Sequence, residues 1–194
     1  VLLTVFFDVG RYLTIGFMGI YKVKELMLTV GTVQLINIAG NLARFFLSKP
    51  FGRFSDRTSY ARGMELALCI AAVGFFLNMF SQPSAKLFVV LFTVLYAVSA
   101  AGTNQNSLNI VYSYVPMEYF VPACAIKNSI GGVCGFLASL LGARILSAVQ
   151  ENGNMVLGVP LYGQQLLSLL SFLVITAAVL YVHFVIEKQV VMRQ

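Results

Sequence analysis

The chain has 194 residues, of which 59% are hydrophobic and 10% are charged, whereas an ordinary soluble domain has about 45–50% apolar and about 25% charged residues. This surplus of apolar residues excludes a soluble globular domain, because a core of this size cannot bury it. The net charge of +6 does not indicate nucleic-acid binding, because the 13 Lys and Arg residues form no long run and lie beside apolar segments.

Six apolar segments predict six transmembrane helices, which we expect to form one domain over residues 1–194. A membrane-spanning helix needs roughly 20 mostly apolar residues. Its backbone must be helical, because lipid offers no partner for unpaired N–H and C=O groups. The expected fold class is therefore an all-α integral membrane bundle. The predicted helices cover about residues 1–21, 26–48, 63–80, 87–114, 121–149 and 161–186.

The segment between the second and third predicted helices, residues 49–62, carries four Lys or Arg residues. The positive-inside rule places it on the cytoplasmic side. Counting helices from it puts the C-terminus, with Lys188 and Arg193, on the same side and the loop 150–160 outside. Three lysines oppose this orientation, namely Lys22, Lys24 and Lys86. We expect an integral protein of the plasma membrane with its C-terminus inside.

Polar residues recur on one face of the first, second and fourth predicted helices, when residues are placed at 100° intervals. A polar side chain at membrane depth is costly unless it faces a cavity or a partner helix. We interpret these three faces as the lining of one aqueous substrate cavity. The proposed cavity residues are Asp8, Arg11, Tyr12, Gln34, Asn37, Asn41, Arg44, Gln105, Asn106, Asn109 and Tyr112.

An alternative role for these faces is hydrogen bonding that only holds the helices together, at roughly 0.6–2 kcal/mol per contact. The segment 103–109, with the sequence TNQNSLN, favours the cavity, because four amides in six residues exceed what helix adhesion needs. Asn104 points away from the other amides on the helical wheel, and we expect it to be structural.

Asp8 is the one carboxylate deep inside a predicted helix, and Arg11 lies three residues further on the same helix, where the two can pair. One hypothesis is that Asp8 neutralises Arg11, or Arg44 across the cavity. Another is that Asp8 takes up and releases a proton and so couples transport to a proton gradient.

Small residues form a stripe along the fifth predicted helix at Gly131, Gly135, Ala138 and Gly142. Such stripes let helix backbones approach closely, and we interpret this one as a packing surface. The cysteines contain no CxxC pair and lie in or beside apolar stretches. We expect no metal site and no cofactor.

Residues 52–57, GRFSDR, resemble the loop motif Gly-x-Leu-x-Asp-Arg/Lys of the major facilitator superfamily of transporters. Gly52, Asp56 and Arg57 match the motif, Phe54 replaces its Leu, and the segment that follows departs from the Gly-Arg-Arg/Lys end. The degenerate copy is similar to the one in the C-terminal half of family members.

A second resemblance follows the fourth predicted helix. Residues 115–118, VPME, followed by NSIGG at 128–132, are similar to the family's Val-Pro-x-Glu-x-Arg segment that leads into a glycine-rich helix. The Arg expected after Glu118 is missing, since Tyr119, Phe120 and Val121 follow.

The resemblance implies half of a major facilitator fold, in which the substrate site lies between two six-helix halves. It also implies that Gly52, Asp56 and Arg57 form a conformational-gating loop; the alternative is that the arginines only set the topology. In the family the first and fourth helices of each half line the cavity.

The expected function is secondary active transport of a small solute by alternating access, with this chain as the C-terminal half. The expected partners are the solute, the lipid bilayer, and either an N-terminal six-helix half upstream in the same chain or a second copy in a homodimer. The alternatives are half of a multidrug-type exporter and a non-transporting membrane module. We do not expect an enzyme, because one His and one deep carboxylate supply no catalytic set.

Overall fold

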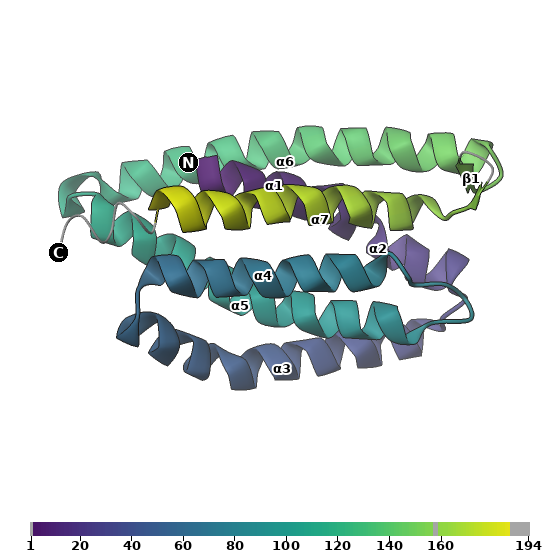
Figure 1. Ribbon diagram of the computed structural model, residues 1–194, viewed down its shortest axis with the longest axis horizontal. Helices are drawn as coiled ribbons and strands as arrows, with labels where there is room; N and C mark the ends of the chain where they lie inside the picture. Colours follow the sequence, from purple (N-terminus) through teal and green to yellow (C-terminus); the bar gives the residue numbers. More distant parts are fainter. Residues whose placement is uncertain (1, 157–158, 187–194) are drawn as a thin grey trace.

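Long apolar segments of the sequence fold as helices that lie lengthwise beside one another (Figure 1). The structure, a computed structural model, describes residues 2–156 and 159–186, and in this part of the chain it has six long helices. Val1, Lys188 and Arg193 lie outside the described residues, as does the predicted position of the C-terminus. The long helices are α1 (Leu2–Thr14), α3 (Val30–Arg57), α4 (Tyr60–Asn78), α5 (Leu87–Tyr114), α6 (Phe120–Glu151) and α7 (Gly163–Tyr181).

Shorter elements connect or extend these helices. The chain beyond α1 changes its helical pitch three times before α3 begins, and α7 continues into a π-helical turn. The short elements are the 3₁₀ turn Ile15–Phe17, α2 (Met18–Ile20), the π-helical turn Tyr21–Glu25, the 3₁₀ turn Met117–Tyr119, the strands β1 (Met155–Val156) and β2 (Val159–Pro160), which pair antiparallel, and the π-helical turn Val182–Ile186.

The chain is an integral membrane protein with five candidate membrane spans among its described residues. Each is long and apolar enough to cross a bilayer: Leu2–Glu25, Tyr60–Asn78, Leu87–Ser113, Met117–Glu151 and Gly163–Ile186. The sequence predicted six spans, and the helix that is not among the five is α3. At 28 residues α3 is long enough to cross, but the polar residues along it lower its mean hydropathy.

The prediction of a loop directly after the second helix is wrong, because α3 continues as a helix to Arg57. Gly52, Asp56 and Arg57 therefore lie in the last turns of α3. Pro50 lies inside the helix, where its ring removes one backbone hydrogen bond and bends the axis without ending it. The bend is visible in Figure 1.

The actual connection between α3 and α4 is short and capped on both sides. The Thr58 hydroxyl donates a hydrogen bond to the Phe54 carbonyl at 2.7 Å. The Ser59 hydroxyl accepts one from the backbone N–H of Arg62 at 3.1 Å, as an N-cap residue does. These caps replace the bonds that helix ends otherwise lack.

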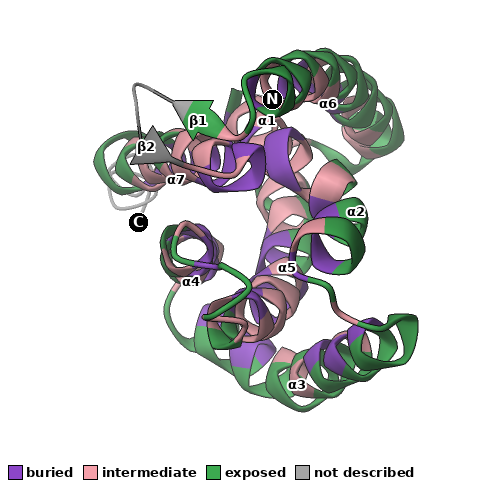
Figure 2. Ribbon diagram, turned by 90° about the vertical axis from the view of Figure 1, so that its right-hand side faces the viewer, coloured by how far each residue is buried: buried purple, intermediate pink, exposed green. Residues whose placement is uncertain are grey.

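The helices pack in two groups of three. Helix α1 contacts α6 and α7, while α5 contacts α3 and α4, and the packing of α4 on α7 joins the two groups. Viewed along the helices, α1 and α5 lie inside the bundle, whereas α3 and α6 lie at its edge with largely exposed surfaces (Figure 2). The apolar core is built mainly from α1, α4, α5 and α7.

The packing also relates the first three long helices to the last three. When α1, α3 and α4 are replaced by α5, α6 and α7 in order, the contact of α1 with α6 becomes the contact of α5 with α3. In the same way, the contact of α1 with α7 becomes that of α5 with α4, and the contact of α4 with α7 is retained. Helices α1 and α5 run in opposite directions (Figure 1). The two three-helix units are therefore arranged as an inverted repeat.

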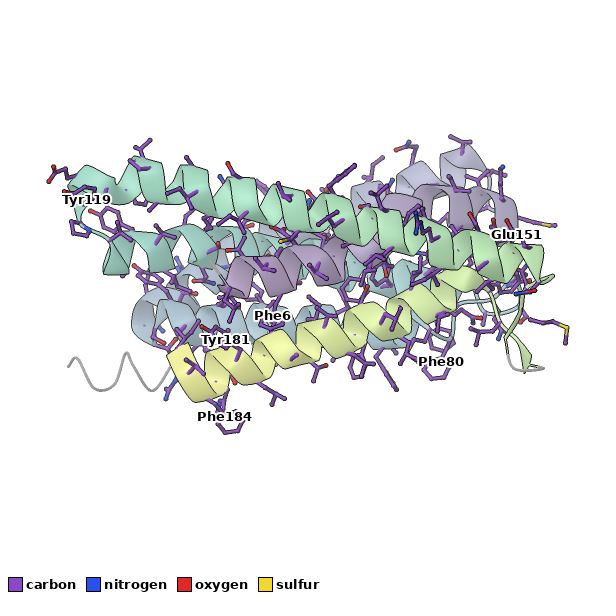
Figure 3. The ribbon with its side chains drawn as sticks, turned by 90° about the horizontal axis from the view of Figure 1, so that it is seen from above. Phe6, Phe80, Tyr119, Glu151, Tyr181 and Phe184 are labelled. Atoms are coloured by element: carbon purple, nitrogen blue, oxygen red, sulfur yellow. The ribbon has the colours of Figure 1, made fainter. Side chains whose placement is uncertain are left out.

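A buried polar network ties α1, α4 and α7 together at the end of the bundle opposite to the N-terminus. The Asn78 amide donates to the Ser168 hydroxyl at 2.7 Å, and the Gln164 amide donates to the Thr14 carbonyl at 2.9 Å. The hydroxyls of Thr14 and Ser171 are 2.7 Å apart. At the other end, the rings of Phe6 and Tyr181 face each other between α1 and α7 (Figure 3).

Candidate functional site

A cavity of about 280 Å³ lies between α1, α5 and α6. Its residues come from most of the length of α1, from positions 103–107 of α5 and from the first half of α6. Most of the side chains around it are polar or charged. Its lining comprises Thr4, Phe7, Asp8, Arg11, Tyr12, Thr103, Asn104, Ser107, Lys127, Asn128 and Gly132.

Helix α1 supplies the cavity with Thr4, Asp8, Arg11 and Tyr12. These residues are spaced by four, three and one positions, so they share one face of the helix. Another side of α1 packs against α7. Gly10 lies on that side, where a Cβ would be 2.8 Å from the Ile175 side chain. The structure thus places all three predicted cavity residues of the first helix at the cavity.

Two cations and one carboxylate line the cavity, namely Arg11, Lys127 and Asp8. The charges of both cations act on Asp8, but neither forms an ion pair with it within 4.0 Å among the described residues. The Arg11 guanidinium carbon lies 4.8 Å from the centre of the Tyr12 ring, a cation–π distance. The Nε of Arg11 is buried and has no hydrogen-bond partner.

Lys127 reaches across the gap between α6 and α5. Its side chain is only 7% exposed, and its Nζ donates a hydrogen bond to the Ser107 hydroxyl at 2.9 Å. Helices α5 and α6 contact each other little, and this bond links them at the cavity that both helices line. Sequence reasoning did not include Lys127 in the site.

The predicted cavity residues of α5 lie elsewhere. Gln105 packs over Gly52 of α3, where a Cβ would be 2.9 Å from the Gln105 amide nitrogen. Asn106 is fully buried beside Gly63 of α4 and donates to the Gly102 carbonyl at 2.9 Å. The α5 residues that line the cavity are Thr103, Asn104 and Ser107. Asn104, which we expected to be structural, is thus a cavity residue.

Asn109 and Tyr112 lie further along α5, beyond the cavity. Tyr112 is 60% exposed, and its ring contacts Phe120 edge-to-face, with the ring centres 5.9 Å apart. The Asn109 carbonyl accepts a hydrogen bond from the Ser113 hydroxyl at 2.8 Å. Both residues therefore lie near the C-terminal end of α5, outside the cavity lining.

The polar residues of α3 do not line this cavity either. Gln34, Asn41 and Arg44 are exposed, and Asn37 is half-buried. Arg44 nevertheless interacts electrostatically with Tyr96 of α5, as do Asp8 and Arg11. Charged residues of α1 and α3 thus act on the same tyrosine of α5.

The three residues that the family resemblance assigned to gating differ in their surroundings. Gly52 is buried under Gln105, while Asp56 and Arg57 are exposed at the end of α3. An exposed carboxylate at a helix C-terminus faces the negative end of the helix dipole, so the dipole of α3 does not favour the Asp56 carboxylate at this position.

Two signals in the sequence could have found the missed residues. Lys127 and Asn128 are adjacent polar residues inside an otherwise apolar helix, and such residues are costly at membrane depth unless they face a cavity. Ser107 lies one turn after Thr103 and three residues after Asn104, so these three share a face.

Within residues 2–156 and 159–186, no group of three or more His, Cys, Asp or Glu side chains is placed to hold a metal ion. The side chains that line the cavity offer hydrogen bonds and charge. Comparisons of the chain with protein-family models, with curated proteins and with solved structures find no match.

Proposed function

We propose that this chain is half of a secondary transporter that moves a small polar solute across a membrane by alternating access. The observation that carries the proposal is the inverted repeat, in which the unit α1, α3 and α4 corresponds to the unit α5, α6 and α7. Nested repeats of this kind build each six-helix half of major facilitator transporters, and their inverted units allow one site to open alternately to each side. The resemblance of residues 52–57 and 115–118 to motifs of that family supports the same assignment.

The position of the polar cavity supports transport. It lies against α1 and α5, the first helices of the two inverted units, and these are the helices that would line a central pathway. At the cavity, the buried Nε of Arg11 has no hydrogen-bond partner, and Asp8 forms no hydrogen bond among the described residues. Such groups are available to a solute.

The exposed polar face of α3 supports a second half. Gln34, Asn41 and Arg44 are exposed on a helix that packs against the apolar spans of α4 and α5. Lipid cannot solvate these side chains, so water or protein must cover them. An N-terminal six-helix half upstream in the same gene product, or a second copy of this chain, would supply that cover and the opposite wall of the pathway.

The lining of the cavity favours a hydrogen-bonding solute over a lipophilic drug. Phe7 is the one residue of its lining that is purely apolar and large, whereas Asn104, Ser107 and Asn128 offer hydrogen bonds. A multidrug-type exporter would need a more aromatic wall.

The test is transport by the complete gene product that contains this chain, reconstituted into proteoliposomes and supplied with radiolabelled polar solutes. We expect protein-dependent uptake that saturates with solute concentration and falls in Asn104→Ala. The matched control is Gln82→Ala, which removes an exposed amide in the connection between α4 and α5 and should leave uptake unchanged. The proposal would be contradicted if, for every solute, protein-free vesicles took up as much as the proteoliposomes.

A further inference from the structure

We propose that the cavity between α1, α5 and α6 selects an organic anion, and that Lys127 and Arg11 bind its carboxylate or phosphate group. This inference rests on the proposed function and specifies the class of solute. It is carried by the charge of the lining, by the burial of Lys127, and by the hydrogen-bonding capacity that the cavity leaves unused.

The charges of the lining do not balance. Two cations and one carboxylate face the cavity, and an additional negative group would make the site neutral. Asp8 cannot satisfy both cations, and it forms no ion pair with either within 4.0 Å in the described part of the chain. A buried or membrane-embedded cation is expensive unless it is paired. The anionic group of a solute would supply the missing partner.

Lys127 has donors to spare. The ammonium group has three N–H donors, and one of them bonds to Ser107. Its side chain is 93% buried, since 7% is exposed, so bulk water does not readily satisfy the others. A solute oxygen that accepts from Lys127 would form a charge-assisted hydrogen bond, which is about twice as strong as a neutral one.

Arg11 offers a second anchor that is already oriented. Its guanidinium group lies over the Tyr12 ring, which restricts its rotation, and its buried Nε lacks a hydrogen-bond partner. A planar guanidinium can bind a carboxylate or phosphate through two parallel hydrogen bonds. Asn104 and Asn128 lie on the same lining and can bind the hydroxyl or amide groups of the uncharged part of the solute.

A second, smaller cavity extends the site on its apolar side. It has a volume of about 110 Å³ and shares Thr4, Ser107 and Lys127 with the first. Its other walls are Leu2, Leu3, Ile110, Val111, Tyr181 and Ile186. Lys127 therefore lies where a polar compartment meets an apolar one, a position suited to the charged group of a solute that also has a short hydrocarbon part.

The experiment is direct binding to the complete gene product in lipid nanodiscs, measured by calorimetry and by ligand-dependent thermal stability. The probes are matched pairs that differ in charge: gluconate and glucose 6-phosphate against glucose, and benzoate and butyrate against benzyl alcohol and butanol. We expect at least one anion to bind at least about tenfold more tightly than its neutral match, the gain that one charge-assisted hydrogen bond gives.

Two substitutions of Lys127 test its role. Lys127→Gln should lose about tenfold in affinity for the anion but keep its affinity for the neutral match, while Lys127→Arg should retain anion binding. The matched control is Lys22→Gln, because Lys22 is also buried and bonded to a hydroxyl, that of Thr93 at 2.9 Å, but does not line the cavity. It should leave the anion preference unchanged.

The wild-type comparison needs no variant, so it remains decisive if Lys127→Gln fails to fold. Equal binding of anions and neutral matches would overturn the inference, as would the absence of binding by every anion tested. A Lys127→Gln protein that folds and keeps the anion preference would also overturn it. Transport of a neutral solute without anion preference would leave the proposed function standing and refute only this inference. Anion binding without transport of any solute would support this inference and refute the proposed function.

Discussion

Gly142 of α6 lies against the backbone of Leu13 in α1, so closely that a Cβ on Gly142 would be 2.8 Å from the Leu13 carbonyl oxygen. Gly135, two turns earlier, faces the Tyr12 ring with as little space. The stripe of small residues predicted along this helix is therefore a packing surface, and its partner is α1. Close approach of this kind is how membrane helices gain contact energy without a hydrophobic driving force.

We predict that Gly142→Ala destabilises the bundle by about 1–3 kcal/mol, the usual effect of overpacking. The backbone oxygen of Leu13 cannot rotate away, so α1 and α6 would have to separate. Gly132→Ala is the control, because nothing lies within 4 Å of a Cβ at that position of the same helix. Thermal unfolding in nanodiscs measures both; equal melting temperatures for the two variants would contradict the packing geometry.

The two asparagines at positions 104 and 106 should respond differently to truncation. Asn104 lines the cavity, so Asn104→Ala should weaken solute binding and leave the melting temperature nearly unchanged. Asn106 is buried beside Gly63 and away from the cavity, so Asn106→Ala should lower the melting temperature and leave affinity within about twofold. Affinity and thermal stability measured on the same preparations separate the two effects. The reverse pattern would mean that α5 presents its other face to the solute.

These two residues show what helical periodicity can and cannot predict. Periodicity groups residues that share a face, and it did so for both helices. On α1 the two charged residues, Asp8 and Arg11, lie on one face, so that face could be assigned to the cavity directly. On α5 polar residues occupy two faces, and the rotation of the helix against α3 and α4 decides which one is open. Gly52 and Gly63 leave room for Gln105 and Asn106, and that packing involves residues far away in the sequence.

The end of α3 shows a second limit. Proline, glycine and several charges in residues 49–57 are typical of a loop, and we predicted one. A proline inside a helix bends it and costs about 3 kcal/mol, however, without ending it. Phe51, Gly52 and Ser55 beyond the proline are buried, and their packing against the neighbouring helices favours helix to Arg57. The long apolar runs, in contrast, could be predicted because the bilayer leaves them no other structure.

Asp56 provides a test of the gating role that the family resemblance implies. Its carboxylate is exposed, and it lies in the last turn of α3, where the helix dipole disfavours a negative charge. Asp56→Asn should therefore not lower thermal stability. If Asp56 makes a contact in another conformation of the transport cycle, the same variant should slow transport severalfold while solute affinity stays unchanged.

Transport rate and equilibrium binding, measured on the Asp56→Asn protein, distinguish a gating role from that of a surface residue without a role in transport. The matched control is Glu151→Gln, which neutralises an exposed carboxylate at the C-terminal end of α6 and should leave transport unchanged. Unchanged transport in Asp56→Asn would show that the Asp56 carboxylate has no part in gating.

Asp8 is the final test, because it connects the charge of the cavity with the energy source of transport. Asn has the same shape as Asp but cannot take up a proton. If a proton on Asp8 couples solute movement to a pH gradient, Asp8→Asn should abolish uphill accumulation in proteoliposomes with an imposed gradient. It should spare exchange of labelled for unlabelled solute, because exchange needs only the loaded carrier. Uphill accumulation at the wild-type rate would refute proton coupling through this residue.

The same substitution also bears on the charge of the solute. Removing the carboxylate leaves Arg11 and Lys127 as two cations without a compensating charge in the lining, so an anionic solute should bind Asp8→Asn more tightly than it binds the wild type. A neutral solute should bind both proteins alike. Calorimetry with a matched charged and neutral pair therefore separates the two roles of Asp8: loss of coupling appears in accumulation, and loss of its negative charge appears in anion affinity. Weaker anion binding by Asp8→Asn would mean that Asp8 holds Arg11 or Lys127 in place.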